Sequence, residues 1–240
     1  MKNLYTVAFY NLENLFDTVN DPKILDDDFT PGTEMDWNEK RYSKKLKRLG
    51  QIISQIGYEE TTHPPVLIGV AEVENETVIK GLVNSKFLKS KNYSYVHFDS
   101  PDERGIDTAL LFRSDCFEVL HKEAITLLVN NEEGMRDFTR DILYVKGKLE
   151  NEIVHLFINH WPSRREGVEI TNHKRVAAAM KNREIISKIT AVDPRANIVV
   201  MGDFNDDPTS ESAKTLSGTD LYNPMELLLT KYSGSLNYQH

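Results

Sequence analysis

Short apolar runs, mostly of β-branched and aromatic residues, punctuate this 240-residue chain, and polar residues follow several of them directly. Nearly continuous runs of this length are typical of strands that are covered on both faces. Four runs end at residues that can bind a metal or transfer a proton: 4–10 before Asn11, 66–71 before Glu72, 154–158 before Asn159 and His160, and 198–201 before Gly202 to Asn205. We therefore expect a site built at the ends of buried strands.

The remaining pattern predicts further strands and three helices. Strands are expected over 93–99, 107–113, 117–125, 140–149 and 153–158, and the short connection at 150–152 makes the last two a hairpin. Residues 39–56 carry an apolar stripe at helical spacing, with Gly57 as a stop. Asn75 is expected to cap a short helix. A longer helix over 168–189 has Val176, Met180 and Ile186 on roughly one face.

Strands outnumber helices, and hairpins mix with strand–helix–strand crossovers. This pattern favours an α/β (α+β) fold, a mixed sheet system covered by helices, over a doubly wound parallel sheet. Residues 17–38 form a long acidic loop with proline and glycine, and such a loop inside a compact domain is usually functional or mobile. No repeat or shift in composition marks a boundary, so we expect a single domain over residues 1–240.

Composition and charge exclude some classes of protein and of site, but they do not indicate a function. A formal net charge of −8 argues against a protein that coats nucleic acid by bulk electrostatics. It still permits a nucleic-acid substrate, because a bound cation and local arginines can supply the attraction. Cys116 is the only cysteine, which excludes a disulfide framework and a cysteine-rich metal site. We find no leader at the N-terminus and no apolar run near the roughly 18 residues of a membrane span, which leaves the compartment open.

The segment Gly202-Asp203-Phe204-Asn205 is the first candidate for chemistry. A glycine after an apolar strand permits a tight turn, and an acid and an amide two positions apart project to the same side of an extended chain. Asp203 could accept a proton or orient water, and Asn205 could hold a phosphoryl oxygen. The alternative is an ordinary turn, since Asp206-Asp207-Pro208 is typical turn sequence.

Glu72 and the segment from Asn159 to Arg165 add complementary groups. A carboxylate that closes an apolar strand suits a hard cation such as Mg²⁺ or Mn²⁺, although a charge beside a helix start is the simpler interpretation. His160 leaves a buried strand and precedes a proline-containing loop with Arg164 and Arg165. Histidine transfers protons near neutral pH and arginines recognise phosphate, whereas the alternative is a structural histidine with solvated arginines.

Two further residues precede strands. Asp107 enters the strand at 107–113 and could orient His160, as a carboxylate orients a catalytic imidazole. Arg140 opens the strand at 140–149 and could clamp a phosphate, with a surface ion pair as the equal alternative.

Together these motifs resemble the endonuclease/exonuclease/phosphatase superfamily, which includes deoxyribonuclease I, abasic-site endonucleases, inositol polyphosphate 5-phosphatases and neutral sphingomyelinases. The residues of these motifs are most similar to those of a bacterial branch described as predicted nucleases. The resemblance spans roughly Leu4 to Pro208 and rests on five motifs in order: FYNLENLFD, EVEN, RGIDTALLFR, NHWPSR and MGDFND.

The resemblance implies a four-layer α/β/β/α sandwich of two mixed β-sheets flanked by helices, with a metal-dependent site at one edge. By motif, Glu72 would be the main metal carboxylate and Asn11 its neighbour, with Mg²⁺ or Mn²⁺ as the ion. His160 would stabilise the phosphoryl group or protonate the leaving oxygen. Asp203 would orient or deprotonate the attacking water, and Asn205 would hold a nonbridging oxygen. Asn159, Arg140 and Arg164 would contact the substrate.

The C-terminal end departs from this family pattern. Members end with a strand and a Ser-Asp-His-type motif whose histidine pairs with the aspartate at the position of Asp203. No such motif follows Asp207, and His240 does not lie in one. We therefore expect the domain to be truncated relative to a longer natural protein, or to be completed by another chain.

Three functions remain open at this level. The first is a phosphodiesterase, a nuclease acting on DNA or RNA. The second keeps the metal site but hydrolyses a phosphomonoester or releases a phospholipid head group. The third is a catalytically impaired domain of the same fold that binds phosphorylated ligands or partner proteins. The oligomeric state stays undetermined.

Overall fold

Two four-stranded sheets form the centre of the molecule in the computed structural model, which describes residues 4–131 and 133–229. The first sheet has the order β1 (Val7–Leu15), β2 (Leu67–Val73), β4 (Asp107–Arg113) and β3 (Tyr93–His97). The second has the order β10 (Asn197–Asp203), β9 (Glu152–His160), β8 (Ile142–Leu149) and β5 (Phe117–Ile125). A small hairpin joins β6 (Val129–Asn130) to β7 (Arg136–Asp137).

Each sheet has one parallel pair, β1 with β2 and β10 with β9, and its other pairs are antiparallel. Asn11 lies opposite Ala71 in the first pair, and Asp203 lies opposite His160 in the second. Since parallel strands finish at the same edge of a sheet, their carboxyl ends bring polar residues from distant parts of the sequence together. This topology positions the site.

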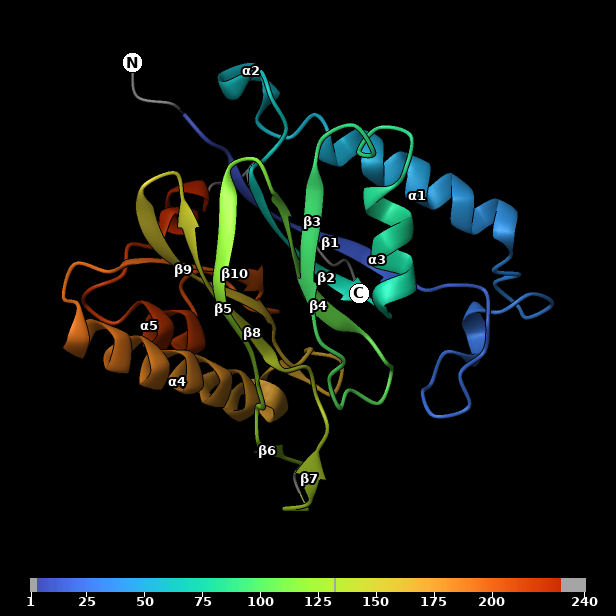
Figure 1. The fold of residues 1–240 in the computed structure, drawn as a ribbon. Coiled ribbons are helices and arrows are strands. Elements are labelled where there is room, and N and C mark those ends of the chain that lie inside the picture. The colour runs from blue at the N-terminus through green and yellow to red at the C-terminus, as the bar shows by residue number, and fades with distance from the viewer. Residues whose placement is uncertain (1–3, 132, 230–240) are drawn as a thin grey trace.

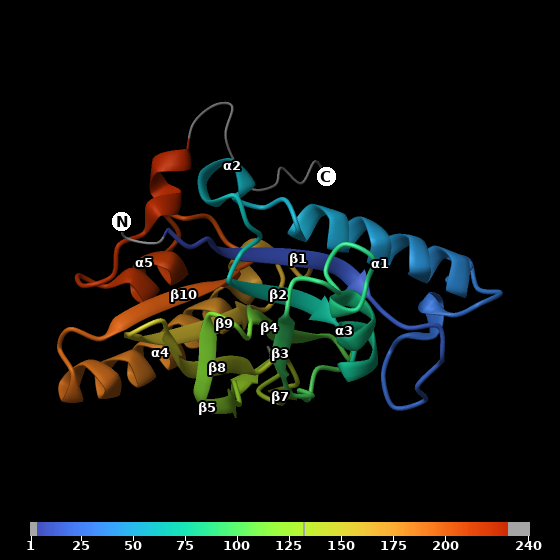
Figure 2. The same cartoon turned by 45° about the horizontal axis from the view of Figure 1, so that its top comes forward.

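Helices cover the outer faces of the two sheets (Figures 1 and 2). On the first sheet lie α1 (Glu39–Ile53) and α3 (Glu76–Val83), whose apolar side chains share a core with β1, β2 and β4. On the second lie α4 (Val168–Val192) and α5 (Glu211–Ser217). A third apolar cluster fills the space between the sheets. The expected mixed α/β sandwich is confirmed.

Local signals account for many of the boundaries. Asn75 caps α3 as expected, since its side chain accepts hydrogen bonds from the backbone of Thr77 and Val78. Such a cap contributes about 1 kcal/mol. The hairpin at 150–152 is also present, between β8 and β9. Gly57 does not end α1, which stops at Ile53, but it takes φ 70° and begins the short α2 (Tyr58–Thr61).

Two further expectations need correction. The first strand begins at Val7 and continues to Leu15, past a break in register between Asn11 and Leu15 that positive φ angles at Glu13 and Asn14 accommodate. The long helix buries a different face, because Met180 is 60% exposed while Arg175 and Asn182 are fully buried. Those two polar residues are stabilised by partners in other elements, which helical periodicity does not reveal.

Outside these layers the chain forms short elements only. The acidic segment 17–38 contains one turn of 3-10 helix, η1 (Asp27–Phe29), and a second 3-10 helix, η2 (Pro224–Leu228), follows α5. His240 and the rest of the segment after Leu229 lie outside the described residues. In the described part of the chain, no helix combines the length and the apolar character needed to span a bilayer.

Candidate active site

Four of the predicted residues meet at one edge of the sandwich. The amide of Asn11, on β1, donates to Glu72 Oε1 at 3.2 Å and to Asp203 Oδ2 at 3.0 Å. His160 Nε2 lies 3.9 Å from the same Glu72 oxygen. Asn11 and Glu72 come from the first sheet, whereas His160 and Asp203 come from the second. The site therefore spans the interface between the two sheets.

The backbone turns Glu72 toward this edge. Glu72 has φ 62°, and the pairing of β2 with β4 shifts register between Ala71 and Val73. A left-handed conformation costs a non-glycine residue about 1 kcal/mol, and such strain collects at functional sites. The bulge leaves the Glu72 side chain 14% exposed between buried neighbours. A buried strand thus ends in a carboxylate that a ligand can reach.

Glu72 and Asn11 offer oxygen atoms suited to a hard divalent cation. Glu72 Oε2 accepts the backbone N–H of Asn14 at 2.7 Å, which orients the carboxylate and leaves lone pairs for a further ligand. Asn11 adds an amide oxygen, and the one hydrogen bond that this oxygen accepts from the described residues comes from the N–H of Glu13, at 2.8 Å. Carboxylate and amide oxygens are the ligands that Mg²⁺ prefers, so these residues fit the expected ion.

His160 is buried and neutral. Burial lowers its pKa well below the ordinary value, and the positive charges of Arg140 and Arg104 lower it further. The imidazole is only 5% exposed, and its Nδ1 has no hydrogen-bond partner among the described residues. A neutral ring with Nε2 beside Glu72 can present one N–H to a ligand at the site.

The expectation that Asp107 orients His160 is wrong. Asp107 Oδ2 instead pairs with His97 Nε2 at 3.0 Å, and its other oxygen accepts the backbone N–H of Ser100 at 2.9 Å. Burial raises the pKa of Asp107, against these hydrogen bonds. The antiparallel pairing of β3 with β4 brings His97 beside this carboxylate, and short-range sequence patterns did not predict that contact.

Asp203 and Asn205 form a compact turn. Asp203 Oδ1 accepts the backbone N–H of Asn205 at 3.0 Å, and the Asn205 amide donates to the Trp161 carbonyl at 2.9 Å. Asn205 has φ 49°, a left-handed conformation that asparagine tolerates. The Arg164 Nε donates to the Asn205 carbonyl at 2.8 Å, so the loop after β9 grips this turn from the other side.

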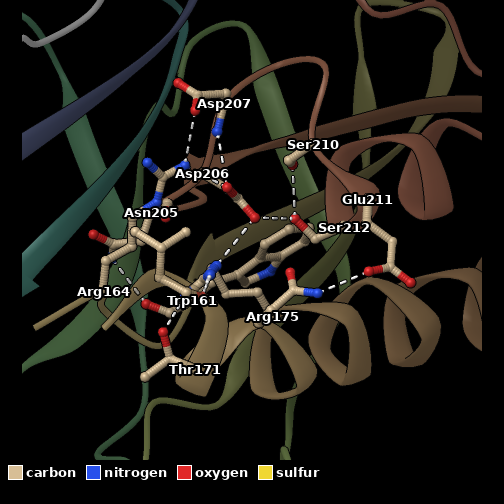
Figure 3. Close-up of polar contacts among 12 residues, drawn as sticks. Trp161, Arg164, Thr171, Arg175, Asn205, Asp206, Asp207, Ser210, Glu211 and Ser212 are labelled. Atoms are coloured by element: carbon tan, nitrogen blue, oxygen red, sulfur yellow. Dashed lines mark hydrogen bonds and ion pairs between the residues drawn. The ribbon is translucent and has the colours of Figure 1, made fainter. Parts of the chain in front are cut away.

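A buried charge network supports that turn (Figure 3). Asp206, with a side chain only 5% exposed, accepts hydrogen bonds from Arg175 at 3.0 Å, from Ser212 at 2.6 Å and from Arg164. Burial alone would raise the pKa of Asp206, but these three donors outweigh it and the pKa is lowered. The sequence around Asp206 predicts only an ordinary turn. The missed signal was Arg175, a cation on the face of α4 that packs against the sheet.

Three expected substrate contacts point elsewhere. Asn159 is fully buried, and its amide oxygen accepts from Trp161 Nε1 at 3.0 Å and from Asn182 at 2.8 Å. Arg140 is 8% exposed and donates to the carbonyls of His160 and Trp161 at 3.2 and 2.7 Å. Arg164 is paired with Asp206 and Asp207. These side chains support the site, because most of their donors are already bound inside the protein.

A family model described as "Endonuclease/Exonuclease/phosphatase family" matches residues 6–240. The chain belongs to this family. Its members are phosphoesterases and generally use divalent metals, and the strand-end motifs of the sequence lie where the two sheets meet. No curated protein matches the chain.

Solved structures share the fold at low identity. The catalytic domain of human Nocturnin, with bound sulfate, is 18% identical at a TM-score of 0.53. TDP2 from Caenorhabditis elegans is 19% identical at 0.51, and a mannosyl-6-phosphatase from Bacteroides thetaiotaomicron is 16% identical at 0.54. The matches cover 73%, 70% and 87% of this chain, and 62%, 44% and 68% of those chains. The chain therefore spans less than two thirds of the first two.

Proposed function

We propose that this protein is a divalent-metal-dependent phosphoesterase that hydrolyses phosphodiester bonds, with DNA or RNA as substrate. The observation that carries the proposal is the constellation of Asn11, Glu72, His160 and Asp203, drawn from both sheets and joined by contacts of 3.0 to 3.9 Å. Such a mixture of carboxylate, amide and neutral imidazole suits P–O bond hydrolysis.

Glu72 and Asn11 would hold Mg²⁺ or Mn²⁺ at the end of β1 and β2. When bound, the ion would neutralise charge that grows on the phosphoryl oxygens. The protein's contribution is to fix the oxygen donors in advance, since Glu72 is oriented by two hydrogen bonds, from Asn11 and from Asn14. Preorganised donors stabilise a developing charge without a cost of reorganisation during the reaction.

The second sheet would supply the groups that act on the attacking water and on the phosphoryl oxygens. Asp203 would orient or deprotonate the attacking water, because hydrogen bonds from Asn11 and Asn205 aim its carboxylate into the site. Neutral His160 would donate a hydrogen bond from Nε2–H to a phosphoryl oxygen and so stabilise the charge that develops there. Asn205 would bind a nonbridging oxygen by exchanging its contact with the Trp161 carbonyl for one with the substrate.

A phosphomonoesterase is the second candidate. The structural match to the Bacteroides thetaiotaomicron mannosyl-6-phosphatase covers more of this chain than the matches to Nocturnin and TDP2 do. At 16% identity it supports an alternative substrate without deciding it. The same residues would act on either ester, because both reactions transfer a phosphoryl centre to water.

The test is hydrolysis with Mg²⁺ or Mn²⁺ of plasmid DNA, RNA, bis(p-nitrophenyl) phosphate, inositol phosphates and a sugar phosphate. We expect Glu72→Ala and His160→Ala to lower kcat by about 10²- to 10³-fold, the range for loss of a group that stabilises developing charge. His121→Ala, on the exposed side of β5, is the matched histidine control.

The outcomes separate the candidate functions. Activity on phosphomonoesters alone would replace the nuclease by a phosphatase. Equal turnover by His160→Ala and the unmodified protein would refute the assigned mechanism. Ligand binding without turnover on any of the esters would favour the impaired-domain interpretation.

A further inference from the structure

Arginines surround the candidate site, and most of them are neutralised within the protein. Arg140 pairs with Asp102 at 3.0 Å, Arg175 pairs with Asp206 at 3.0 Å, and Arg164 pairs with Asp206 and Asp207. Arg104 and the exposed Arg165 differ, because no ion pair joins either of them to a carboxylate in residues 4–131 and 133–229, and of the two only Arg104 is partly buried. An anionic substrate would therefore find the charge of Arg104 less compensated than the charges of Arg140, Arg164 and Arg175.

Arg104 lies next to the groups that define the site. Its guanidinium donates to the side-chain oxygen of Asn14, whose backbone N–H donates to Glu72 Oε2 at 2.7 Å. The charge of Arg104 is close enough to lower the pKa of His160, and the charge of Glu72 acts on Arg104 in turn. One residue thus separates this cation from the candidate metal carboxylate.

The loop that carries Arg104 is held in place before any ligand binds. Asp102 accepts the backbone N–H of Arg104 at 3.1 Å and a guanidinium N–H of Arg140 at 3.0 Å. Arg140 in turn donates to the His160 carbonyl at 3.2 Å. Gly105 completes the turn at φ 65°, where an added Cβ would lie 2.3 Å from Ile24. The backbone of Arg104 is therefore tied to that of His160, which reduces the ordering cost of binding.

The environment of Arg104 leaves hydrogen-bonding capacity for a ligand. A guanidinium has five N–H donors in a planar fork, and within the described residues its side chain makes one hydrogen bond, to Asn14. Burial lowers the pKa of Arg104, and Arg165 and Arg140 lower it too, whereas Glu72 raises it. A partly desolvated guanidinium with spare donors is well suited to bidentate recognition of phosphate.

We propose that Arg104 binds the phosphoryl group of the substrate, the role that sequence analysis assigned to Arg140 and Arg164. This inference deepens the proposed function and rests on it. Arg140 acts behind Arg104 as a positioning residue through Asp102, and Arg164 supports the Asn205 turn. The phosphoryl group would lie between Arg104, His160 and Glu72. There the positive charge of Arg104 would balance the negative charges of Glu72 and of the phosphoryl oxygens.

Inorganic phosphate is the probe for this proposal, because its binding can be measured without turnover. Isothermal titration calorimetry in Mg²⁺ compares the unmodified protein with Arg104→Ala and Arg104→Gln. Arg104→Gln removes the charge and the guanidinium fork but keeps a polar side chain with an N–H₂ group. Arg195→Ala is the matched control, since it removes the same charge from an exposed position before β10, whose other end carries Asp203. Thermal unfolding of each variant reports on folding.

We expect both Arg104 variants to bind phosphate at least tenfold more weakly and to raise KM for the best ester by a similar factor. Arg104→Lys should recover part of the affinity, and Arg195→Ala should match the unmodified protein. Phosphate binding that is unchanged in Arg104→Gln, or absent from the unmodified protein, would overturn the assignment of Arg104. Arg104-dependent phosphate binding without hydrolysis of any ester would instead keep this assignment and refute the proposed function.

Discussion

Two acidic residues next to the candidate site have buried side chains but opposite electrostatic surroundings. Asp206, beyond Asn205, has two arginines and a serine as partners, and its pKa is lowered. Glu74, two residues after Glu72, is 7% exposed, and burial together with the charges of Asp17, Asp26 and Asp21 raises its pKa to about 7. Within the described residues, no ion pair compensates Glu74 or those three aspartates.

This difference distinguishes two walls of the site. One wall consists of the second sheet with the segments that follow β9 and β10, and the other consists of the first sheet with the acidic segment 17–38. On the second sheet, paired charges hold the loop after β9 and the turn after β10 in one arrangement. On the first sheet, the acidic segment 17–38 lies against Glu74, and Asp26 has an oxygen without a hydrogen-bond partner among the described residues although it is 2% exposed. Uncompensated buried charge opposes folding, so this wall should be the less stable of the two.

The largest effect should follow from breaking the compensated wall. Asp206→Ala leaves Arg175, which is fully buried, without its carboxylate partner. Removing one member of a buried pair costs about 3–5 kcal/mol, which corresponds to a fall in Tm of about 10 °C for a chain of this size. Denaturant titration and calorimetry measure both quantities. A loss below about 1 kcal/mol would show that the network contributes little.

The same wall also predicts a dependence on acid. The folded-state pKa of Asp206 is lowered, so its contribution to stability is present above the unfolded value of about 3.9 and is lost as pH falls through the folded value. Unfolding free energies of the unmodified protein and Asp206→Asn should therefore converge below about pH 4. A constant difference at every pH would contradict ionisation as the cause.

Arg164→Ala should have an intermediate effect. Asp206 keeps Arg175 and Ser212, while the Asn205 carbonyl loses its 2.8 Å contact. We expect a loss of about 1–2 kcal/mol in stability. Arg165→Ala, at the exposed neighbouring position, is the control for stability. A lower kcat in Arg164→Ala than in Arg165→Ala, measured where both variants are folded, would indicate that Arg164 acts by holding Asn205. Equal kcat values in the two variants would exclude this role.

Glu74→Gln should stabilise the other wall. Because the folded-state pKa of about 7 lies above the unfolded value of about 4.3, stability is full below pH 4.3 and is lost as pH rises through 7. Glutamine removes that loss and still accepts the backbone N–H of Asp17, a contact of 2.6 Å. We expect a gain of about 1–2 kcal/mol at pH 8, and none at pH 4, in chelator without divalent cation. Destabilisation by Glu74→Gln at pH 8 would contradict the interpretation that the charge of Glu74 is uncompensated.

The smallest effect is expected at the start of α3. Asn75→Ala removes the side-chain acceptor for two backbone N–H groups of that helix and should cost about 1 kcal/mol. Asn75→Asp restores an acceptor and should recover most of the loss. Equal destabilisation by both substitutions would assign the effect to the contact of the Asn75 amide with Asp17 instead.

Local patterns in the sequence determined much of the fold. The expected strands over 107–113 and 117–125 coincide with β4 and β5, because β-branched and aromatic runs bounded by polar residues carry their own signal. Asn75 was identified as a helix cap for the same reason, since a cap acts within four residues. Polar residues placed at strand ends also predicted that Glu72, His160 and Asp203 would meet.

Only the tertiary structure decided which charged residues face the site. The sequence alone does not distinguish Arg104 from Arg140 and Arg164. In the structure, Arg140 pairs with Asp102 and Arg164 pairs with Asp206, and both carboxylates lie 38 residues or more away along the chain. The partner of Asp107 was likewise set by the pairing of β3 with β4. Electrostatic pairing depends on distance in space, which strand topology brings about between segments far apart in the chain. Sequence therefore determined where the site forms, and folding determined which of its charges remain available.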